Sequence, residues 1–106
     1  MFDKLDSIRK KYEDLAVKIA DPKVIADQET WRKLMKEHSD LGDIVEKYKE
    51  YLSHEEQAEE MREMLREPED DEMRVLIETE LGEHQQAMEQ CESELKYLLI
   101  PKDPND

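Results

Sequence analysis

The feature that most constrains this chain is a regular spacing of core-type residues near its C-terminal end. Six consecutive steps alternate between four and three residues, at Ile77, Leu81, His84, Met88, Cys91, Leu95 and Leu98. This alternation puts every one of these side chains on one face of an α-helix. A strand, whose side chains alternate with a period of two, cannot do so. The segment is therefore predicted to be a helix over about residues 71–99 that packs against other helices.

Two earlier segments repeat the same steps, and each is predicted to be a helix. The first covers about residues 2–20, with its apolar face at Leu5, Ile8, Tyr12, Leu15 and Ile19. The second covers about residues 28–66, with the same steps at Trp31, Leu34, His38, Leu41, Val45, Tyr48 and Leu52. Asp21 and Pro22 separate the two helices, because proline cannot continue a helix, and a short turn is expected there.

The second predicted helix is long, and its apolar phase changes near Ser53. The apolar positions beyond that point continue from Tyr51 rather than from Leu52. A change of phase alters the local winding or marks a break, and a continuous helix is the favoured interpretation. Asp27 can cap the start of this helix, and Pro68 is the first proline that can end it.

Composition agrees with an all-α fold. Charged residues make up 43% of the 106 residues, and only two residues are glycine, which is typical of long helices. Short connections make neighbouring helices antiparallel. The predicted fold is an elongated antiparallel three-helix bundle with a protruding two-helix, coiled-coil-like arm. One domain is expected over residues 1–100, in which residues 1–8, 41–48 and 88–98 share a core and residues 55–80 form the arm.

The acidic charge is concentrated in the second half of the chain. The formal net charge is −14, of which residues 1–53 contribute −1 and residues 54–106 contribute −13. Ten carboxylates and only two arginines lie between Glu55 and Glu72. Such a surface repels phosphate, so no direct RNA binding is expected from the arm, and a basic protein partner fits it better. A solvated face that only keeps the protein soluble is the alternative.

Several classes of function find no support in the sequence. No stretch is long and apolar enough to span a membrane, and no signal-peptide core follows Met1, so a soluble cytoplasmic protein is expected. Cys91 is expected to be buried. The three histidines lack a second histidine or cysteine at metal-ligand spacing, and no phosphate-binding loop or nucleophile elbow occurs. We therefore expect no catalytic residue, no cofactor and no metal.

The last nine residues, from Leu98 to Asp106, take an apolar helix end into an acidic connector with prolines at 101 and 104. This segment resembles the end of the N-terminal helical domain in the bacterial peptide chain release factor 1 family. Members of this family are class I release factors. Residues 25–29 and 36–41 resemble the start and continuation of that domain's long helix. The resemblance covers essentially the whole chain, and residues 101–106 are accordingly expected to begin a linker to further domains.

The resemblance implies a non-catalytic role in translation termination. Neither the Pro-x-Thr motif that reads stop codons nor the Gly-Gly-Gln motif that triggers hydrolysis occurs here. The domain would instead dock the factor on the ribosome, near the protein and rRNA of the large-subunit stalk base, with a translational GTPase as a further candidate partner. The expected contact residues lie at the tip of the arm and are Glu63, Glu67, Pro68, Glu69, Asp70, Asp71 and Glu72. Reversing the charges at 69–71 in the full-length factor is expected to weaken ribosome association or recycling and to leave the folding of the isolated domain intact.

Two alternative functions stay open at this point. One is a free-standing acidic adaptor or chaperone-like hairpin that binds proteins without a ribosomal role. The other is a metal- or thiol-dependent regulator that uses Cys91 and the histidines. A coding sequence that continues beyond Asp106 would favour the release factor, and a stop codon there would count against it.

Overall fold

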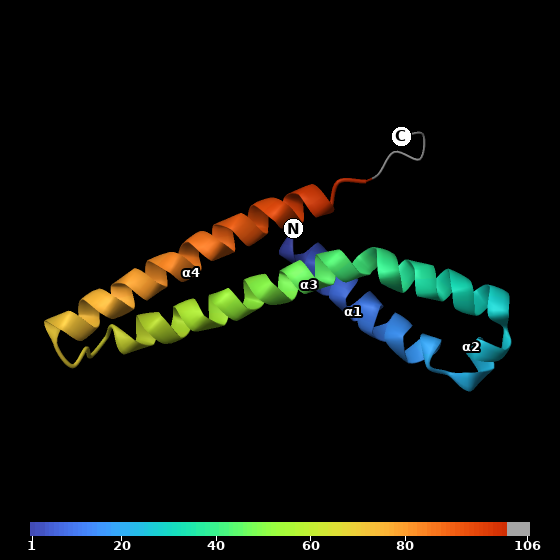
Figure 1. Ribbon diagram of the computed structural model, residues 1–106, viewed down its shortest axis with the longest axis horizontal. Helices are drawn as coiled ribbons and strands as arrows, with labels where there is room; N and C mark the ends of the chain where they lie inside the picture. The colour runs from blue at the N-terminus through green and yellow to red at the C-terminus, as the bar shows by residue number, and fades with distance from the viewer. Residues whose placement is uncertain (102–106) are drawn as a thin grey trace. The chain divides into compact units, whose positions relative to one another are not determined.

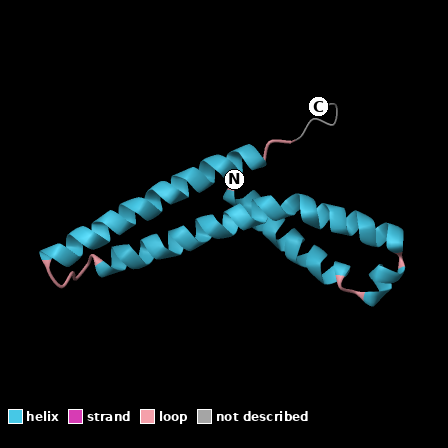
Figure 2. Cartoon of the chain, viewed as in Figure 1, coloured by secondary structure: helices cyan, strands magenta, loops and turns pink. Residues whose placement is uncertain are grey.

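The computed structural model describes residues 1–101, and helices make up most of them (Figure 1, Figure 2). In chain order the helices are α1 (Phe2–Ile19), α2 (Pro22–Ala26), α3 (Gln28–Met64) and α4 (Asp71–Leu98). No strand occurs among the described residues, so the predicted all-α class is confirmed. The three long helices end one or two residues before their predicted ends. Residues 102–106, most of the predicted linker, lie outside the described residues.

The chain divides into two compact units, Met1–Glu46 and Lys47–Asp106. Helix α3 contributes to both, because it continues for 37 residues without interruption. Ser53 lies inside this helix, so the change of apolar phase does not break it, as the favoured interpretation predicted. The single core predicted for residues 1–8, 41–48 and 88–98 stays a prediction.

The connection between α1 and α3 contains a helix where a simple turn was predicted. The Asp21 side chain accepts a hydrogen bond of 3.0 Å from the backbone N–H of Lys23, and Pro22 occupies the first helical position. Proline suits this position because its φ is already helical and its missing N–H would be unpaired there anyway. The prediction of a turn is wrong because the proline that ends α1 also starts α2.

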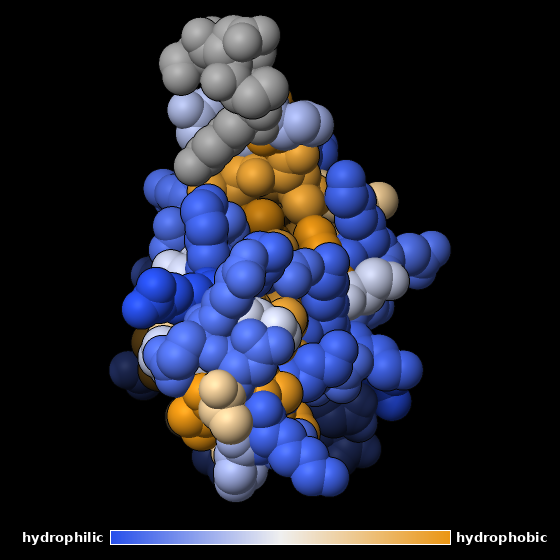
Figure 3. All heavy atoms as spheres, turned by 90° about the vertical axis from the view of Figure 1, so that its right-hand side faces the viewer, coloured by the Kyte–Doolittle hydropathy of each residue, from blue (hydrophilic) through white to orange (hydrophobic). Residues whose placement is uncertain are grey.

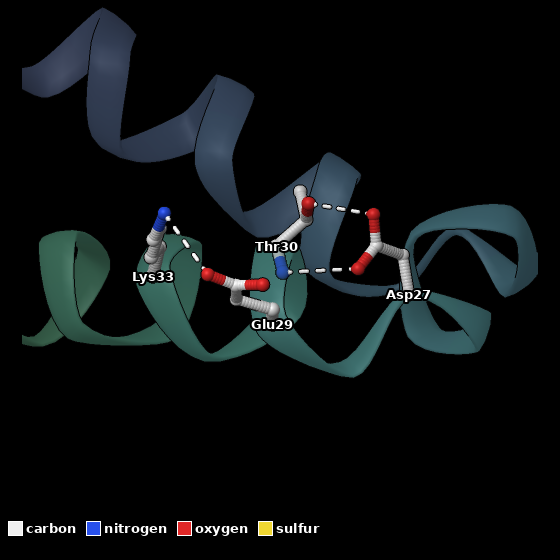
Figure 4. Close-up of polar contacts among 4 residues, drawn as sticks. All are labelled: Asp27, Glu29, Thr30 and Lys33. Atoms are coloured by element: carbon white, nitrogen blue, oxygen red, sulfur yellow. Dashed lines mark hydrogen bonds and ion pairs between the residues drawn. The ribbon is translucent and has the colours of Figure 1, made fainter.

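Asp27 caps the start of α3, as predicted. Its carboxylate accepts a hydrogen bond from the backbone N–H of Thr30 at 3.3 Å and another from the Thr30 hydroxyl at 2.8 Å (Figure 4). These bonds, the side-chain one above all, hold the pKa of Asp27 below its ordinary value. One turn further on, Lys33 pairs with Glu29 across 3.5 Å, a spacing that supports an exposed helix.

In the unit Met1–Glu46, α1 runs antiparallel to the first part of α3 (Figure 1). The Tyr12 ring stacks on the His38 ring, with centroids 4.0 Å apart. Nearer the connection, the Trp31 indole N–H donates to the Ile19 carbonyl oxygen at 3.2 Å. Both contacts agree with the antiparallel packing of these two helices that the sequence predicts. Leu15 is one of the buried side chains of this unit.

In the unit Lys47–Asp106, the second part of α3 runs antiparallel to α4 (Figure 1). Its buried side chains are Tyr48, Tyr51, Ala58, Ile77, Cys91 and Leu95. Burial raises the pKa of the Cys91 thiol, and the predicted burial of this residue is confirmed. A small side chain at Ala58, which has no exposed surface, allows α3 and α4 to approach each other closely.

One ion-pair network ties the two helices of this unit together. The Lys47 ammonium lies 2.9 Å from a Glu50 carboxylate oxygen and 2.7 Å from a Glu94 carboxylate oxygen. These hydrogen bonds raise the pKa of Lys47, and the same lysine lowers the pKa of Glu50. The Lys47 side chain is 28% exposed and the two glutamates are 49% and 43% exposed, so solvent screens part of the attraction and limits its contribution to stability.

On the face drawn in Figure 3, hydrophilic residues cover most of the area and hydrophobic residues form smaller patches between them. Within residues 1–101, no helix combines the length and the apolar character needed to cross a membrane.

Candidate functional site

The seven predicted site residues gather at the turn between α3 and α4. Helix α3 ends at Met64 and α4 begins at Asp71, so residues 65–70 form the connection, at the far left of Figure 1. We call residues 63–76 the arm tip. The sequence analysis located this turn correctly because Pro68 cannot continue a helix and the acidic residues after it favour a helix N-terminus.

Asp70 has a structural role at the arm tip. Its backbone is extended, and its side chain accepts a hydrogen bond of 2.7 Å from the backbone N–H of Met73. The Asp70 carbonyl oxygen also accepts a bond of 3.0 Å from the N–H of Arg74. Asp70 is therefore the N-cap of α4, and its loss is expected to cost about 1 kcal/mol of stability. The expectation that charge reversal here leaves folding intact does not fit this geometry.

Two of the other tip carboxylates are engaged in ion pairs. Arg66 lies 3.5 Å from Glu63, and Arg74 lies 3.1 Å from Asp71. Both pairs join exposed side chains, and such pairs contribute little to stability.

Three tip carboxylates stay free of such pairs. Glu67, Glu69 and Glu72 are exposed, and their carboxylates form no ion pair or hydrogen bond with the described part of the chain. These three are the carboxylates most available to a partner. Pro68, between the first two, is half-buried.

The acidic surface continues from the tip along α3. A groove beside this helix is lined mainly by glutamates, and its lining is Leu52, Glu55, Glu56, Glu59, Glu60, Arg62, Glu63 and Met88. Repulsion between these carboxylates and phosphate groups disfavours nucleic acid here. The lining offers carboxylates and one guanidinium, so the groove presents mainly negative charge.

Comparison with known proteins identifies the family of the chain. A model of the PCRF domain matches residues 8–106. The chain belongs to the PCRF domain family. This PCRF domain aligns over all 106 residues with "Peptide chain release factor 1" of Clostridium tetani (47% identical), Clostridium perfringens strain SM101 (48%) and Finegoldia magna (49%). The matched region is the N-terminal domain of bacterial release factor 1.

The PCRF domain is shorter than these relatives. It spans about 30% of the length of the C. tetani and F. magna proteins and 29% of the C. perfringens protein. No solved structure gives a significant match to the chain.

The PCRF domain also contains a histidine pair that the sequence analysis missed. His54 on α3 and His84 on α4 are half-buried, and their Nδ1 atoms lie 2.9 Å apart. The ring centroids are 5.2 Å apart, about as far as they can be at that nitrogen separation, so the two nitrogens point almost directly at each other. At this separation one Nδ1 must carry a proton and donate a hydrogen bond to the other Nδ1.

This histidine pair could have been predicted from the pairing of residues across the two antiparallel helices that are joined near Pro68. An antiparallel fold-back at Pro68 that brings Met61 near Ile77 also places His54 opposite His84, because both pairs are centred on residue 69. Separation along the chain, 30 residues for this pair, gives no information about neighbours on antiparallel helices. Within the described residues, no group of three or more His, Cys, Asp or Glu side chains is arranged to hold a metal ion.

A double-mutant cycle should detect the histidine pair. We expect His54→Ala and His84→Ala to be coupled by about 0.5–1.5 kcal/mol in the free energy of unfolding, since each single change leaves the other ring without its partner. Urea unfolding of the two single variants and the double variant measures this coupling. His54→Ala combined with Gln85→Ala, an exposed neighbour of His84, should be additive. If the effects of His54→Ala and His84→Ala on the free energy of unfolding are also additive, the proposed interaction between the two rings is contradicted.

Proposed function

We propose that this PCRF domain is a non-catalytic docking domain of a translation termination factor. In the proposal it acts in the cytoplasm and positions the factor on the ribosome near the large-subunit stalk base. A translational GTPase that works in the same region is a further proposed partner. The observation that carries the proposal is the alignment of the whole chain with proteins named peptide chain release factor 1.

The geometry of the arm tip supports docking by electrostatic attraction. Glu67 and Glu69 lie in the turn outside both helices, and Glu72 lies in the first turn of α4. All three are exposed and unpaired within residues 1–101. Free carboxylates at the end of a two-helix arm attract a basic surface before contact is made and raise the association rate.

The test is charge reversal at the two turn carboxylates in the full-length factor. Glu67→Lys combined with Glu69→Lys is expected to lower the association rate with large ribosomal subunits by about tenfold at low salt. The difference from the unaltered factor should shrink as salt is raised, since exposed charges are screened over about 10 Å at 0.1 M. Stopped-flow mixing at two salt concentrations measures both effects.

A control variant separates the tip from the total charge. Glu83→Lys combined with Glu89→Lys makes the same change of net charge at exposed positions further along α4. We expect this control to associate at close to the original rate. Equal rates for the tip variant and the unaltered factor would contradict the docking proposal. Circular dichroism of the isolated chain checks that both variants keep their helices.

A further inference from the structure

The hydrogen bond between His54 and His84 depends on the protonation of both rings. The two Nδ1 atoms lie 2.9 Å apart, so one ring donates and the other accepts. Histidine is the side chain that ordinarily gains a proton near neutral pH, at about pH 6.5. The first added proton binds at Nε2 of the donor ring, where it leaves the bond in place. The second must bind at the accepting Nδ1, and the bond is then lost.

A second proton also brings two positive charges together. The ring centroids are 5.2 Å apart and both side chains are half-buried, so water screens their repulsion only in part. In the unfolded chain the two rings are apart and bind protons independently. Between about pH 5 and 6.5 the unfolded chain therefore binds more protons than a folded chain that keeps the bond. Stability is lost as the pH falls through this range.

Each of the two histidines has a glutamate four residues before it on its own helix. Glu50 precedes His54 on α3, and Glu80 precedes His84 on α4. On a helix, an acidic residue attracts a cation four residues later. This attraction is present at Glu50, whose pKa is lowered most by the hydrogen bond from Lys47 and further by the charge of His54. Glu80 is half-buried, and its carboxylate forms no ion pair or hydrogen bond with the described part of the chain.

The other ionisable groups beside the two rings do not supply a second bond between the helices. Glu55 and Glu83 adjoin the histidines in sequence, but both are exposed, and consecutive residues of a helix point in different directions. Tyr51, one turn before His54, is buried, and burial raises the pKa of its hydroxyl, so it carries no charge near neutral pH. Pairs between a glutamate and a histidine of one helix are weak and do not tie α3 to α4.

We propose that the His54–His84 bond is a pH-sensitive tie between α3 and α4. Below about pH 6.5 both rings take protons from the solvent, and the bond between the helices is exchanged for a Glu–His pair within each helix. The arm then loosens around these residues. This inference does not depend on the proposed docking function.

A second tie limits the loosening to part of the arm. Lys47 on α3 lies 2.7 Å from Glu94 on α4. Carboxylates ordinarily lose their charge only below about pH 5, so this ion pair persists in mild acid. The segment between residues 54 and 84 is therefore released, and the part of the two helices near Lys47 stays joined.

Urea unfolding of the chain at about pH 7.5 and at about pH 5 tests the tie. The comparison is with a His54→Gln/His84→Gln variant, which keeps a good helix former at each position and carries the same carboxylates. We expect the lower pH to raise the unfolding equilibrium constant about fivefold more in the unaltered chain than in this variant. His38→Gln removes the histidine that stacks on Tyr12 and should keep the excess. Equal pH dependence with and without the pair would overturn the proposal.

Hydrogen exchange of the unaltered chain tests where the loosening occurs. After correction for the intrinsic effect of pH on exchange, helical amides between residues 54 and 84 should lose protection by about fivefold relative to those near Lys47 and Glu94. An equal loss along both helices, or no loss, would contradict a local tie.

Glu80→Gln tests the exchange of partners, because it removes the carboxylate that would pair with the protonated His84. We expect the midpoint of the His84 ring titration, followed by NMR, to fall by about 0.3 pH units. Glu83→Gln makes the same change at the exposed position next to His84 and should shift the midpoint less. A Glu80→Gln shift no larger than that of this control would contradict the exchange.

Discussion

Replacing Leu95 with alanine is expected to lower the free energy of unfolding of the chain by about 2–5 kcal/mol. Leu95 has no exposed surface and is one of the two largest fully buried side chains among the described residues. Alanine removes apolar atoms from this position and leaves a cavity that the surrounding side chains fill only in part. Leucine and alanine are both good helix formers, so the loss reports packing rather than helix propensity. Urea unfolding followed by circular dichroism measures it.

Leu76→Ala is the matched control for this prediction. The chemical change is the same and both residues lie in α4, but Leu76 is more than half exposed. Its replacement should change the free energy of unfolding by only about 0.5 kcal/mol. A loss below about 1 kcal/mol for Leu95→Ala would mean that this position is not packed as described.

Replacing Ala58 with leucine is expected to destabilise the arm by about 1–3 kcal/mol, because added methylene groups in a packed interior force side chains and backbone to shift. Ala58 has no exposed surface, and its methyl group lies where α3 and α4 are joined as antiparallel neighbours. A larger side chain would push the helices apart. Thermal unfolding measures the loss, and hydrogen exchange should show faster opening over the arm.

Ala16→Leu makes the same change on the exposed side of α1. It should be nearly neutral, since both residues favour helix and no packed neighbour is displaced. Ala58→Gly is a second comparison, because it removes the methyl group and costs about 1 kcal/mol through backbone freedom alone. An Ala58→Leu variant as stable as the unaltered chain would contradict close contact between the helices at this position.

Apolar spacing predicted most of the fold, because long helices with alternating steps of three and four leave little ambiguity. The helices expected over 2–20, 28–66 and 71–99 were observed with ends within two residues. The short helix α2 was missed because five residues cannot show a periodic pattern. Its start is set by two local features, the Asp21 cap and Pro22, and only their combination predicts a helix rather than a turn.

The location of the candidate site was predictable, whereas the roles of its residues were not. An acidic segment after Pro68 indicated a turn at the end of an arm, but net charge cannot tell a capping carboxylate from a free one. That distinction needs the 2.7 Å bond from Met73 to Asp70. The exposure of Val75 and Leu76 was also predictable, because both residues fall outside the series of apolar steps that begins at Ile77.

Aspartate side chains begin three of the helices, at Asp21 for α2, Asp27 for α3 and Asp70 for α4. Capping uses only an oxygen acceptor, and asparagine supplies one equally well without a charge. Asp70→Asn should therefore neutralise part of the tip while α4 still starts at the same residue. Where a helix begins and how much negative charge the arm tip carries are thus separately adjustable properties of this chain. Relatives could diverge in the second while keeping the first.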